Sequence, residues 1–476
     1  MTVRYLIAEK YFERIDIFEQ RSSIGGVWNH SPGGKENLST RTVVPQENPS
    51  KLPEEPVWHR QREKGHRNIS NSNDECIIVS PVYSRMEANS TKMVMQFSDT
   101  PFSRDEPLFP THSSIRKYVE EYAEDVKHMV KLETQVIDVK SIEYGKWSLT
   151  ARSLRTGTIM TDMYDAIVVA NGHYNDPYIP NIVGIESWNE EYQGIITHSK
   201  FYDYPESFTN KKVIVIGNSA SGVDIAKQIS EFCKGKPLLS SRTPNDLFSS
   251  SSNTIDCPEI VEFLSPKSHN RAVRFANGRV EEQIDAILFC TGYVYSYPFL
   301  SSLDPPVVIN GQRVMNLYQQ LFYTYDPTLV FPVLQYRAIP FSLGESQAAV
   351  FARVWSGRLS LPSQADMKSW EDSAVAKTGD SKSFHVFGYP LDLEYLSFLQ
   401  DWASKAEKRS GLVNNGNGKQ VPRFGEKEKW LRVRSFPDIK RAFGERVRLD
   451  GVKVTTIEEL GFDYDEWKSK HGGYRL

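Results

Sequence analysis

Residues 213–225, with the sequence VIVIGNSASGVDI, have the pattern of a site for a nucleotide pyrophosphate. Gly217 can form the tight turn after the apolar run, and Gly222 lets the following helix pack close to the preceding strand. The small side chains of Ser219 and Ser221 allow the backbone to approach the phosphates, which the free N–H groups at the start of that helix can bind. The segment is therefore predicted to bind a dinucleotide, although Ser219 replaces the second glycine of G-x-G-x-x-G.

The sequence around this turn supports the same interpretation. The run Val213–Ile216 is apolar on both faces, which is typical of a buried parallel strand. Apolar residues then recur at helical spacing, and we assign the first of them, Val223, and its neighbour Asp224 to the cofactor site. The alternative is a strand-to-helix turn that binds no ligand. The residues at helical spacing are Val223, Ile225, Ala226 and Ile229.

Arg242 follows the next predicted strand, at the position where the adenosine ribose lies in such units. Leu238–Ser240 form that strand, and neither Ser241 nor Thr243 is acidic. An arginine without an acidic neighbour suits the 2′-phosphate of NADP better than the free ribose of NAD. The alternative is an exposed arginine on a loop.

The composition limits the class of protein but does not identify its chemistry. With 476 residues, 39% of them hydrophobic and 25% charged, the chain can form two or three domains with ordinary cores. Its net charge of -3 gives no reason to expect a nucleic-acid partner. No apolar run reaches the length of a membrane segment, and the first residues contain no signal-peptide core. We therefore expect a soluble, cytoplasmic protein.

The cysteines are far apart in the sequence and have neither CxxC nor metal-ligand spacing. We therefore expect no metal site and a reducing compartment. The lack of a redox cysteine pair also argues against a disulfide reductase, which would share a double nucleotide-binding architecture. The cysteines are Cys76, Cys233, Cys257 and Cys290.

The rest of the pattern indicates one α/β unit interrupted by another. A helix-like segment, residues 1–12, precedes a short strand at Ile15–Glu19, and the polar stretch 42–76 predicts a long surface insertion or loop. Thr134–Val139 and Trp147–Arg152 predict a small β meander. The apolar face of the N-terminal helix is expected to contain Val3, Leu6 and Ile7.

Two further buried strands end in glycine turns. Asn171-Gly172 follows the apolar run Ala166–Ala170, and Thr291-Gly292 follows Ala286–Cys290. This arrangement repeats the strand-and-turn pattern of the first nucleotide motif. We assign Thr291 and Gly292 to the cofactor site.

Residues 192–202, with the sequence YQGIITHSKFY, match the pattern F-x-G-x-x-x-H-x-x-x-[FY] with Tyr192 at the first position. Because this pattern identifies the flavin-containing monooxygenases, the chain resembles that family, in its short soluble form, over nearly its whole length. The related Baeyer–Villiger enzymes end the pattern with Trp-Pro, where this chain has Tyr202-Asp203. The resemblance thus implies oxygenation of heteroatoms, and it implies a structural role for His198 between two domains.

The same resemblance implies an α/β fold with two Rossmann-like dinucleotide-binding domains of the three-layer ββα type. In this arrangement the NADP domain is inserted into the FAD domain, and FAD and NADPH are the cofactors. We predict the first part of the FAD-binding domain at residues 1–202 and the inserted NADP-binding domain at 203–325. The second part of the FAD-binding domain, with a C-terminal extension, is predicted at 326–476.

Residues 17–21, IFEQR, and the GGVW that follows resemble the family's FAD half-site. A carboxylate at a strand end, here Glu19, can accept hydrogen bonds from both ribose hydroxyls of the adenosine. The glycines would bring the backbone next to the cofactor, while Val27 and Trp28 would line the flavin. Without this motif, Glu19 would be an ordinary solvated charge. The residues assigned to FAD are Glu19, Gln20, Arg21, Gly25, Gly26, Val27 and Trp28.

The segment around Asn89, with the MQFSDTPF that follows it, resembles the family's segment with the active-site asparagine. The resemblance places Asn89, with Ala88 and Ser90 beside it, between the flavin ring and the nicotinamide ribose, where an amide offers both a donor and an acceptor. From local sequence alone, an ordinary turn residue is an equal alternative. Residues 341–362 resemble the family's closing helix, in which Gln347 would approach the flavin.

The chain departs from the family pattern at its start. Family members begin with a strand and a G-x-G-x-x-G turn for the FAD pyrophosphate, whereas Met1–Leu6 aligns with the helix after that turn. We expect the sequence to be a truncated form of a longer protein. The alternative is an impaired, non-catalytic remnant of the family that binds NADP and has lost FAD.

The resemblance implies a FAD- and NADPH-dependent monooxygenase of the N,N-dimethylaniline monooxygenase type. Such an enzyme transfers one oxygen atom of O2 to a soft nitrogen or sulfur nucleophile through a C4a-hydroperoxyflavin. The expected substrate is therefore a small thiol, thioether or amine. A homodimer is compatible with this class, but the sequence does not indicate the oligomeric state.

Overall fold

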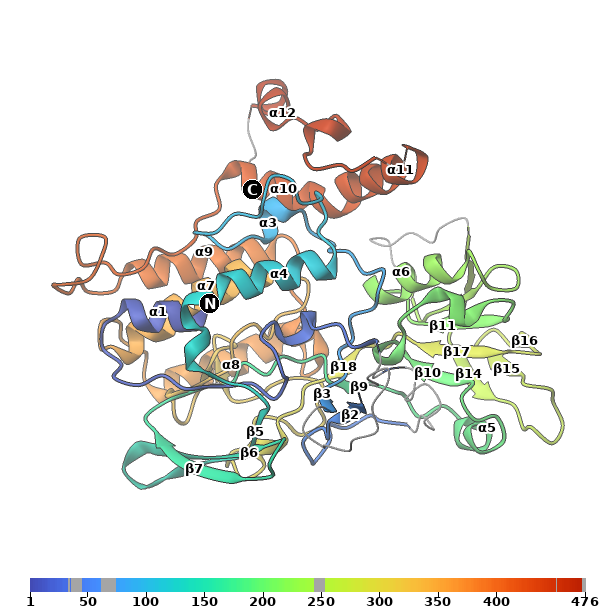
Figure 1. The fold of residues 1–476 in the computed structure, drawn as a ribbon, viewed down its shortest axis with the longest axis horizontal. Helices are drawn as coiled ribbons and strands as arrows, with labels where there is room; N and C mark the ends of the chain where they lie inside the picture. The colour runs from blue at the N-terminus through green and yellow to red at the C-terminus, as the bar shows by residue number, and fades with distance from the viewer. Residues whose placement is uncertain (33–34, 36–44, 61–73, 244–252, 451, 473–476) are drawn as a thin grey trace, which may run out of the picture.

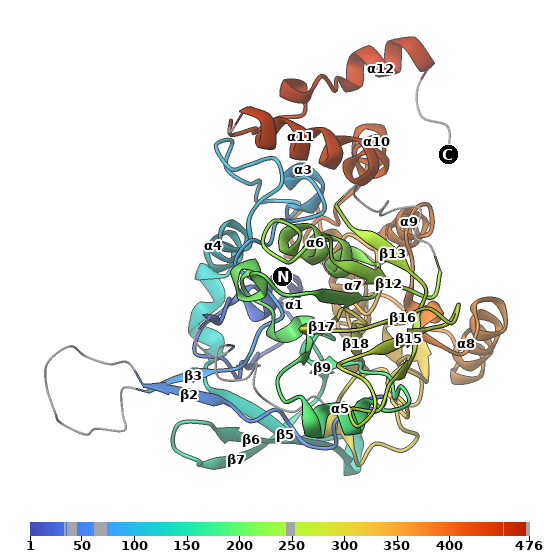
Figure 2. The ribbon, with the colours of Figure 1, turned by 90° about the vertical axis from the view of Figure 1, so that its right-hand side faces the viewer.

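The computed structural model describes residues 1–32, 35, 45–60, 74–243, 253–450 and 452–472. Figure 1 shows a smaller unit, with a parallel sheet and helix α6, beside a larger unit of helices and strands. The last helices of the chain gather at one end of the larger unit (Figure 2). The α/β fold class predicted from the sequence is confirmed.

The smaller unit is built on a five-stranded parallel sheet with the strand order β10-β17-β11-β12-β13. Every residue of β11 and β17 is buried, so these apolar runs form central strands, as predicted. Helix α6 follows β11 and buries its glycine and apolar positions on one face. The elements of this unit are α5 (Ile185–Glu191), β10 (Ile196–His198), β11 (Val213–Ile216), α6 (Ala220–Ile229), β12 (Leu238–Ser240), β13 (Ile255–Cys257), β14 (Ile260–Phe263), β15 (Val273–Phe275), β16 (Val280–Glu281) and β17 (Ala286–Phe289).

The larger unit has a central layer of short strands. The parallel pairs β1–β4 and β8–β21 belong to this layer, and they share no ladder within the described ranges. The strands are β1 (Ile17–Phe18), β2 (Val57–Arg60), β3 (Asp74–Ile77), β4 (Val130–Lys131), β5 (Thr134–Ile142), β6 (Lys146–Ser153), β7 (Ile159–Tyr164), β8 (Ile167–Val168), β9 (Asp176–Pro177), β18 (Tyr293–Val294), β19 (Leu317–Tyr318), β20 (Phe322–Tyr323) and β21 (Leu329–Val330).

Side chains that alternate along β21 enter different cores. Val330 packs in the core that contains helix α7, whereas Leu329 packs in the core beneath the meander β5-β6-β7. The order helix, sheet, meander is the three-layer arrangement that was predicted. The helices are α1 (Thr2–Ala8), α3 (Lys92–Met95), α4 (His112–Tyr122), α7 (Pro340–Trp355), α8 (Gln364–Thr378), α9 (Leu391–Ser404), α10 (Glu426–Arg434), α11 (Lys440–Asp450) and α12 (Tyr464–His471), and a π-helical turn, Ser435–Ile439, connects α10 to α11.

Two local expectations need correction. The described ends of the stretch 42–76 pair as the antiparallel hairpin β2–β3, because both ends contain short β-prone runs, while residues 61–73 lie outside the described part. Helix α1 buries Tyr5 and Leu6, whereas Ile7 is 44% exposed. The helix packs on α7 through a face rotated from the predicted one, since tertiary contact decides the orientation of so short a helix.

The hydrophobic cores place the inserted unit differently from the predicted limits of 203–325. Strand β10 ends at His198, yet it pairs with β17 in the smaller sheet, and Trp188 packs in the same core. At the other end, Tyr295 and Leu317 pack in the core of the larger unit. Core packing therefore assigns α5 and β10 to the inserted unit, and the residues after β18 to the larger one.

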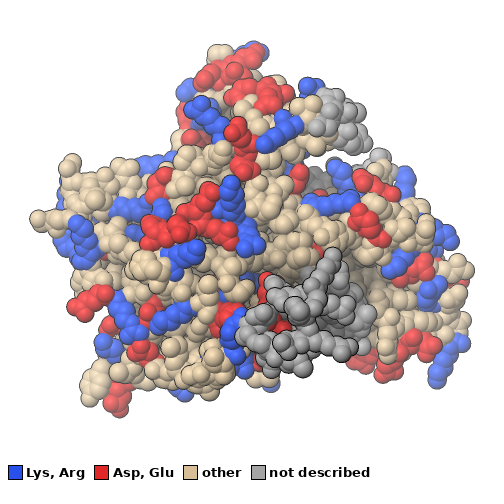
Figure 3. Space-filling view, viewed as in Figure 1, with Lys and Arg blue, Asp and Glu red and all other residues tan. Residues whose placement is uncertain are grey.

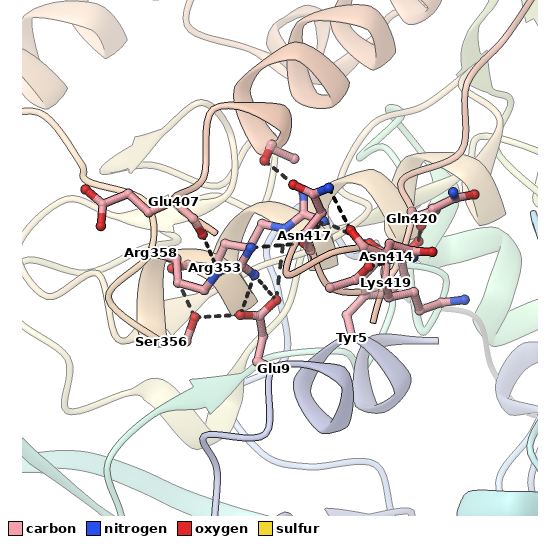
Figure 4. Close-up of polar contacts among 12 residues, drawn as sticks. Tyr5, Glu9, Arg353, Ser356, Arg358, Glu407, Asn414, Asn417, Lys419 and Gln420 are labelled. Atoms are coloured by element: carbon pink, nitrogen blue, oxygen red, sulfur yellow. Dashed lines mark hydrogen bonds and ion pairs between the residues drawn. The ribbon is translucent and has the colours of Figure 1, made fainter. Parts of the chain in front are cut away.

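A buried ion cluster fastens α1 to the C-terminal half of the chain (Figure 4). Both carboxylate oxygens of Glu9 lie 2.8 Å from Nη1 of Arg358, and the hydroxyl of Ser356 donates to Oε2 at 2.8 Å. Arg353 approaches the same carboxylate at 4.0 Å. Both guanidinium groups also donate to main-chain carbonyls between positions 403 and 419. One carboxylate thus links α1, the end of α7 and the loop after α9.

Glu9→Leu should destabilise the protein strongly. The substitution leaves the Arg358 guanidinium buried without its carboxylate, and we expect the free energy of unfolding to fall by about 3 to 5 kcal/mol. Urea unfolding measures this loss. As a control, Glu466→Leu removes an exposed ion pair with Lys470 and should cost less than about 1 kcal/mol. Equal stability of wild type and Glu9→Leu would contradict the role of the cluster.

Candidate functional site

The turn between β11 and α6 is closely packed. A Cβ atom on Gly222 would lie 1.8 Å from the carbonyl oxygen of Gly217, and a Cβ atom on Gly217 would lie 2.6 Å from that of Cys290. Gly217 also has a φ of 107°, which residues with side chains rarely adopt. Glycine is therefore required at both positions, and the backbone of the turn lies against the start of α6.

The start of α6 is accessible to a ligand. Its N-cap residue, Ser219, has an extended backbone and makes no side-chain cap hydrogen bond within the part of the chain that is described. Ser219 and Ser221 are both exposed. Because the first N–H groups of a helix have no partner inside the helix, a phosphate can accept them. The residues present thus fit the pyrophosphate of NADP.

Asn218 links this turn to the end of β12, a contact that the sequence analysis missed. Its amide donates to Ser241 Oγ at 3.1 Å and to the carbonyl of Thr243 at 2.8 Å. Arg242 is 75% exposed and pairs with Glu259 at 3.0 Å, so the structure supplies an acidic neighbour that the adjacent sequence lacks. An exposed pair of this kind contributes little, and the guanidinium can exchange it for a 2′-phosphate.

The other residues assigned to the NADP side are distributed around this turn. Asp224 faces the larger unit, where it accepts a hydrogen bond from the hydroxyl of Tyr83, and burial raises its pKa. Val223 packs against the core formed by β11 and β17. Thr291 and Gly292 connect β17 to β18, next to the carbonyl that confines the phosphate turn. Asp224 therefore joins the two units instead of facing the phosphates.

The FAD half-site follows β1. One carboxylate oxygen of Glu19 accepts a hydrogen bond from the N–H of Arg21 at 2.8 Å, and burial raises the pKa of Glu19. The guanidinium of Arg21 donates to the carbonyl of Ile78. Gln20 accepts a hydrogen bond from the amide of Gln135 in β5 at 3.1 Å. The backbone N–H of Arg21 thus orients the Glu19 carboxylate. The remaining lone pairs of this carboxylate can accept hydrogen bonds from ribose hydroxyls.

The GGVW turn leaves an open backbone surface. Gly25 and Gly26 have φ values of 119° and 52°, and a Cβ atom on Gly26 would meet nothing within 4 Å. Asn29 closes the turn by donating to the carbonyls of Ile24 at 3.1 Å and Gly26 at 3.2 Å. This role of Asn29 was not predicted, although an asparagine next to a glycine turn is a typical signal of a turn residue. The carbonyl of Val27 accepts a hydrogen bond from the hydroxyl of Ser80.

Three distant segments meet in one aromatic core. Trp28 from the GGVW turn, Ala88 from the asparagine segment and Phe341 from the start of α7 pack against it. Within the core, the rings of Phe97 and Tyr122 are stacked with centroids 3.7 Å apart. The structure thus brings together the GGVW turn and the asparagine segment.

Asn89 lies at the edge of this core. It is exposed, between buried Ala88 and half-buried Ser90. The backbone before it is fixed, because the N–H of Ala88 donates to the carbonyl of Pro110 at 2.8 Å. The Asn89 amide is therefore accessible to a cofactor while its backbone is restrained.

Gln347 does not join the cluster. It is fully buried in α7, its oxygen accepts the N–H of Val333 at 2.8 Å, and its nitrogen lies 3.4 Å from the hydroxyl of Tyr395. Gln347 was predicted to approach the flavin. In the structure, its amide is instead already bonded within the helical core. Glu345 instead links α7 to the asparagine segment, since it accepts the N–H and the hydroxyl of Ser98, both at 2.9 Å.

Asp203 connects the two half-sites. Its Oδ1 accepts His30 Nε2 at 2.5 Å and the N–H of Ser84 at 3.0 Å. His30 follows the GGVW turn, and Ser84 precedes the asparagine segment. Beside them, the amine of Lys35 donates to the carbonyl of Tyr202 at 2.8 Å, and burial lowers the pKa of Lys35 to about 7. The chain therefore enters the predicted NADP domain through a residue bonded to both FAD-side segments.

His198 has the structural geometry that the resemblance implied. Its Nδ1 accepts the N–H of Lys200 at 3.0 Å, so Nε2 carries the proton and donates to the carbonyl of Gly292 at 3.1 Å. Burial lowers the pKa of His198 to about 3, which keeps the ring neutral. Lys200 in turn donates to Glu54 and to the carbonyl of Asn175, both at 2.8 Å. His198 thus joins the two ends of the inserted unit.

The described surface can be compared with what a metal site or a membrane segment would require. Figure 3 shows Lys and Arg side chains interspersed with Asp and Glu on the face that it presents. Within the ranges given above, no group of three or more His, Cys, Asp or Glu side chains is placed to hold a metal ion. No helix in those ranges has the length and apolarity needed to cross a bilayer. The two nucleotide half-sites are the candidate site because of the geometry of their glycine turns.

Comparison with known proteins agrees with this geometry. The model of the family described as flavin-binding monooxygenase-like matches residues 65–261 and 263–413. The chain is 32% identical over 405 residues to the flavin-containing monooxygenase FMO GS-OX-like 2 of Arabidopsis thaliana, covering 81% of this chain and 78% of that protein.

Solved structures show the same relationship. S-allyl-L-cysteine S-oxygenase from Allium sativum matches with a TM-score of 0.71 and 25% identity, over 98% of this chain and 95% of that chain. Tmm from Pelagibacter sp. strain HTCC7211 has the same fold, with a TM-score of 0.67 and 19% identity, over 93% of this chain and 88% of that chain.

His198→Gln should make stability less dependent on pH. Because the folded pKa of about 3 lies below the ordinary value of 6.5, the unfolded chain binds a proton that the folded protein does not. This histidine therefore lowers stability as the pH falls from 6.5 toward 3, by about 1.4 kcal/mol per pH unit. Glutamine keeps a donor and an acceptor but does not titrate.

Urea unfolding at several pH values in this window tests the expectation. The free-energy difference between wild type and His198→Gln should shrink with that slope as the pH falls. The exposed His128→Gln is the matched control for the substitution of a histidine by glutamine. A pH-independent difference for His198→Gln would contradict the neutral ring.

Proposed function

This chain belongs to the flavin-binding monooxygenase-like family, and from that premise we propose that it transfers one oxygen atom of O2 to the sulfur of a small thioether. FAD and NADPH are the cofactors of a monooxygenase of this family. The cofactors carry the redox chemistry, and the protein binds, orients and shields them. The proposal therefore depends on how the described residues bring the two half-sites together.

The observation that carries the proposal is that one short segment contacts both half-sites. Tyr83 and Met86 pack with α6 in a core of the NADP unit. Ala88, two residues after Met86, packs with Trp28 in the aromatic core of the FAD side. Asn89 comes next and is exposed. This arrangement supports a site between the two cofactors with Asn89 at its wall.

We assign roles to the residues on this basis. Bound FAD, reduced by NADPH, supplies the chemistry that activates O2. Glu19 would bind the FAD ribose, and the turn from Gly217 to Gly222 would bind the NADP pyrophosphate. The Asn89 amide would donate to one cofactor and accept from the other. The aromatic core beside Trp28 keeps water from one side of the site, which limits the loss of activated oxygen as hydrogen peroxide.

Sulfur is the favoured target for two reasons. The matched Allium sativum enzyme is an S-oxygenase, and its structure covers 98% of this chain. A thioether also has a free lone pair at any pH, whereas an alkyl amine must first lose a proton. The buried His173 and His198 offer no base for that step, because burial lowers the pKa of each to about 3. A thioether needs no such base.

The FAD-loaded protein should convert a methyl thioether to its sulfoxide with NADPH and O2, and a tertiary amine more slowly. Asn89→Leu should remain folded but release hydrogen peroxide, with product per NADPH reduced about ten-fold, the equivalent of one hydrogen bond to a charged group. Mass spectrometry with labelled O2 measures the product. The exposed Asn181→Leu, in the smaller unit, is the control.

Each result has a different consequence for the proposal. Amine oxide without sulfoxide would reject sulfur as the target. Bound FAD without any oxygenated product would support the non-catalytic alternative. Normal coupling in Asn89→Leu would remove the role given to this asparagine.

Arg242→Ala should weaken NADPH and leave NADH nearly unchanged. The loss should be about 1.5 to 3 kcal/mol, the value of a hydrogen bond to a charged group. Michaelis constants for both cofactors measure it. Glu259→Gln, which removes the competing partner of Arg242, should bind NADPH at least as well as the wild type. Equal losses for NADPH and NADH in Arg242→Ala would exclude contact with a 2′-phosphate.

A further inference from the structure

The helices after α9 pack on the segment that follows Asn89. The hydroxyl of Ser435, in the π-helical turn, lies 3.5 Å from that of Thr91. The N–H of Leu108 donates to the carbonyl of Val454 at 2.9 Å. Figures 1 and 2 both show α10 and α11 on the side of the molecule where α3 lies. The C-terminal helices thus form part of the surroundings of the candidate site.

Lys440, the first residue of α11, directs its amine at the same segment. The amine donates to the carbonyl of Ala88 at 2.9 Å and to Oε2 of Glu87 at 3.1 Å. It also lies 4.5 Å from the ring centroid of Phe109 and 5.6 Å from that of Phe443. The side chain is 22% exposed. Two acceptors and two aromatic rings therefore hold the ammonium group in one place.

Helix α6 of the NADP unit supplies the other charges that face this amine. Burial lowers the pKa of Lys440, whereas the carboxylates of Glu87 and Asp224 raise it and the charge of Lys227 lowers it. Glu87 is the charged neighbour on the asparagine segment. The amine thus lies where the C-terminal helices, the asparagine segment and the NADP unit come together.

The hydrogen bond to Ala88 has a specific consequence for Asn89. The carbonyl of Ala88 and the N–H of Asn89 belong to one planar peptide unit, so a bond to that oxygen restrains the backbone from which the Asn89 side chain projects. The N–H of Ala88 is bonded at the same time to Pro110. With both peptide units of Ala88 restrained, the direction of the Asn89 amide is restricted.

We propose that Lys440 is a positioning residue for Asn89. This inference rests on the proposed function, in which the Asn89 amide lies between the two cofactors. Lysine suits the task because its tetrahedral ammonium can bind a carbonyl and a carboxylate in different directions. The planar fork of arginine favours two parallel acceptors, so Lys440→Arg keeps the charge and the ring contacts but reproduces the geometry only in part.

Lys440→Met should loosen the segment and uncouple the reaction. The amides of residues 86–92 should exchange with deuterium about ten-fold faster, since a charge-assisted hydrogen bond is lost. Product per NADPH should fall by about the same factor, while the rate of NADPH oxidation changes less than about two-fold. Lys440→Arg should recover part of the protection from exchange and part of the product per NADPH. Hydrogen exchange followed by mass spectrometry, with and without FAD, and a product assay measure these effects.

Two further variants serve as controls. Lys468→Met removes an exposed lysine of α12 that pairs with Glu426 at 2.9 Å, and it should change neither readout. Glu87→Gln leaves the carbonyl of Ala88 bonded and should show a smaller increase in exchange than Lys440→Met. Glu87→Gln also provides a test if Lys440→Met does not fold.

The readouts separate this inference from the proposed function. Unchanged exchange at residues 86–92 in Lys440→Met would overturn the positioning role, whatever the substrate is. Faster exchange with unchanged coupling would also overturn it, because the segment would then move without effect on the reaction. If the wild type makes no oxygenated product, the proposed function fails, and the exchange measurement alone decides whether Lys440 holds the segment.

Discussion

The carboxylate of Asp203 is the contact that fastens two FAD-side segments of the site to the NADP unit. It lies where the chain enters the predicted NADP domain, and it accepts hydrogen bonds from His30 and Ser84. Each donor belongs to a segment that faces the FAD side, so the GGVW turn and the asparagine segment are both tied to this one carboxylate. Its side chain is only 10% exposed, which favours strong hydrogen bonds. The two nucleotide units are therefore held in register next to the site itself.

Polar and apolar parts of the site have different tasks. The aromatic core behind Trp28 is closely stacked and excludes water, whereas the contacts that set orientation are short, charged and few. Burial keeps His198 neutral, and so adds no charge at the connection between the units. Lys440 and Glu87 form a charged pair beside the asparagine segment, with 3.1 Å between the amine and the carboxylate. In the proposed function, such a division would protect the reduced cofactor while the segments around it are held in place.

Local sequence was sufficient where one segment determines its own structure. Strands β11 and β12 have the predicted bounds, because each is a short buried run that ends at a turn of small residues, as is typical of a parallel strand. Local sequence was insufficient to predict a contact where the two partners are distant in the chain. Glu259 lies beside Arg242 only through the folding of the sheet, and the rotation of α7 that buries Gln347 is set by tertiary packing. Likewise, only the assembled core shows that β10 belongs to the inserted unit.

The individual signals around the FAD half-site are weak for the same physical reason. Helix α1 is held by Glu9, whose partner Arg358 lies 349 positions later in the chain. The asparagine segment is likewise held by Lys440, more than three hundred positions after it. These segments have little structure of their own and obtain their shape from the C-terminal half of the protein. The N-terminal residues of the site are therefore held in place by groups from the end of α7, the loop after α9 and the start of α11, all of which lie in the C-terminal half of the chain.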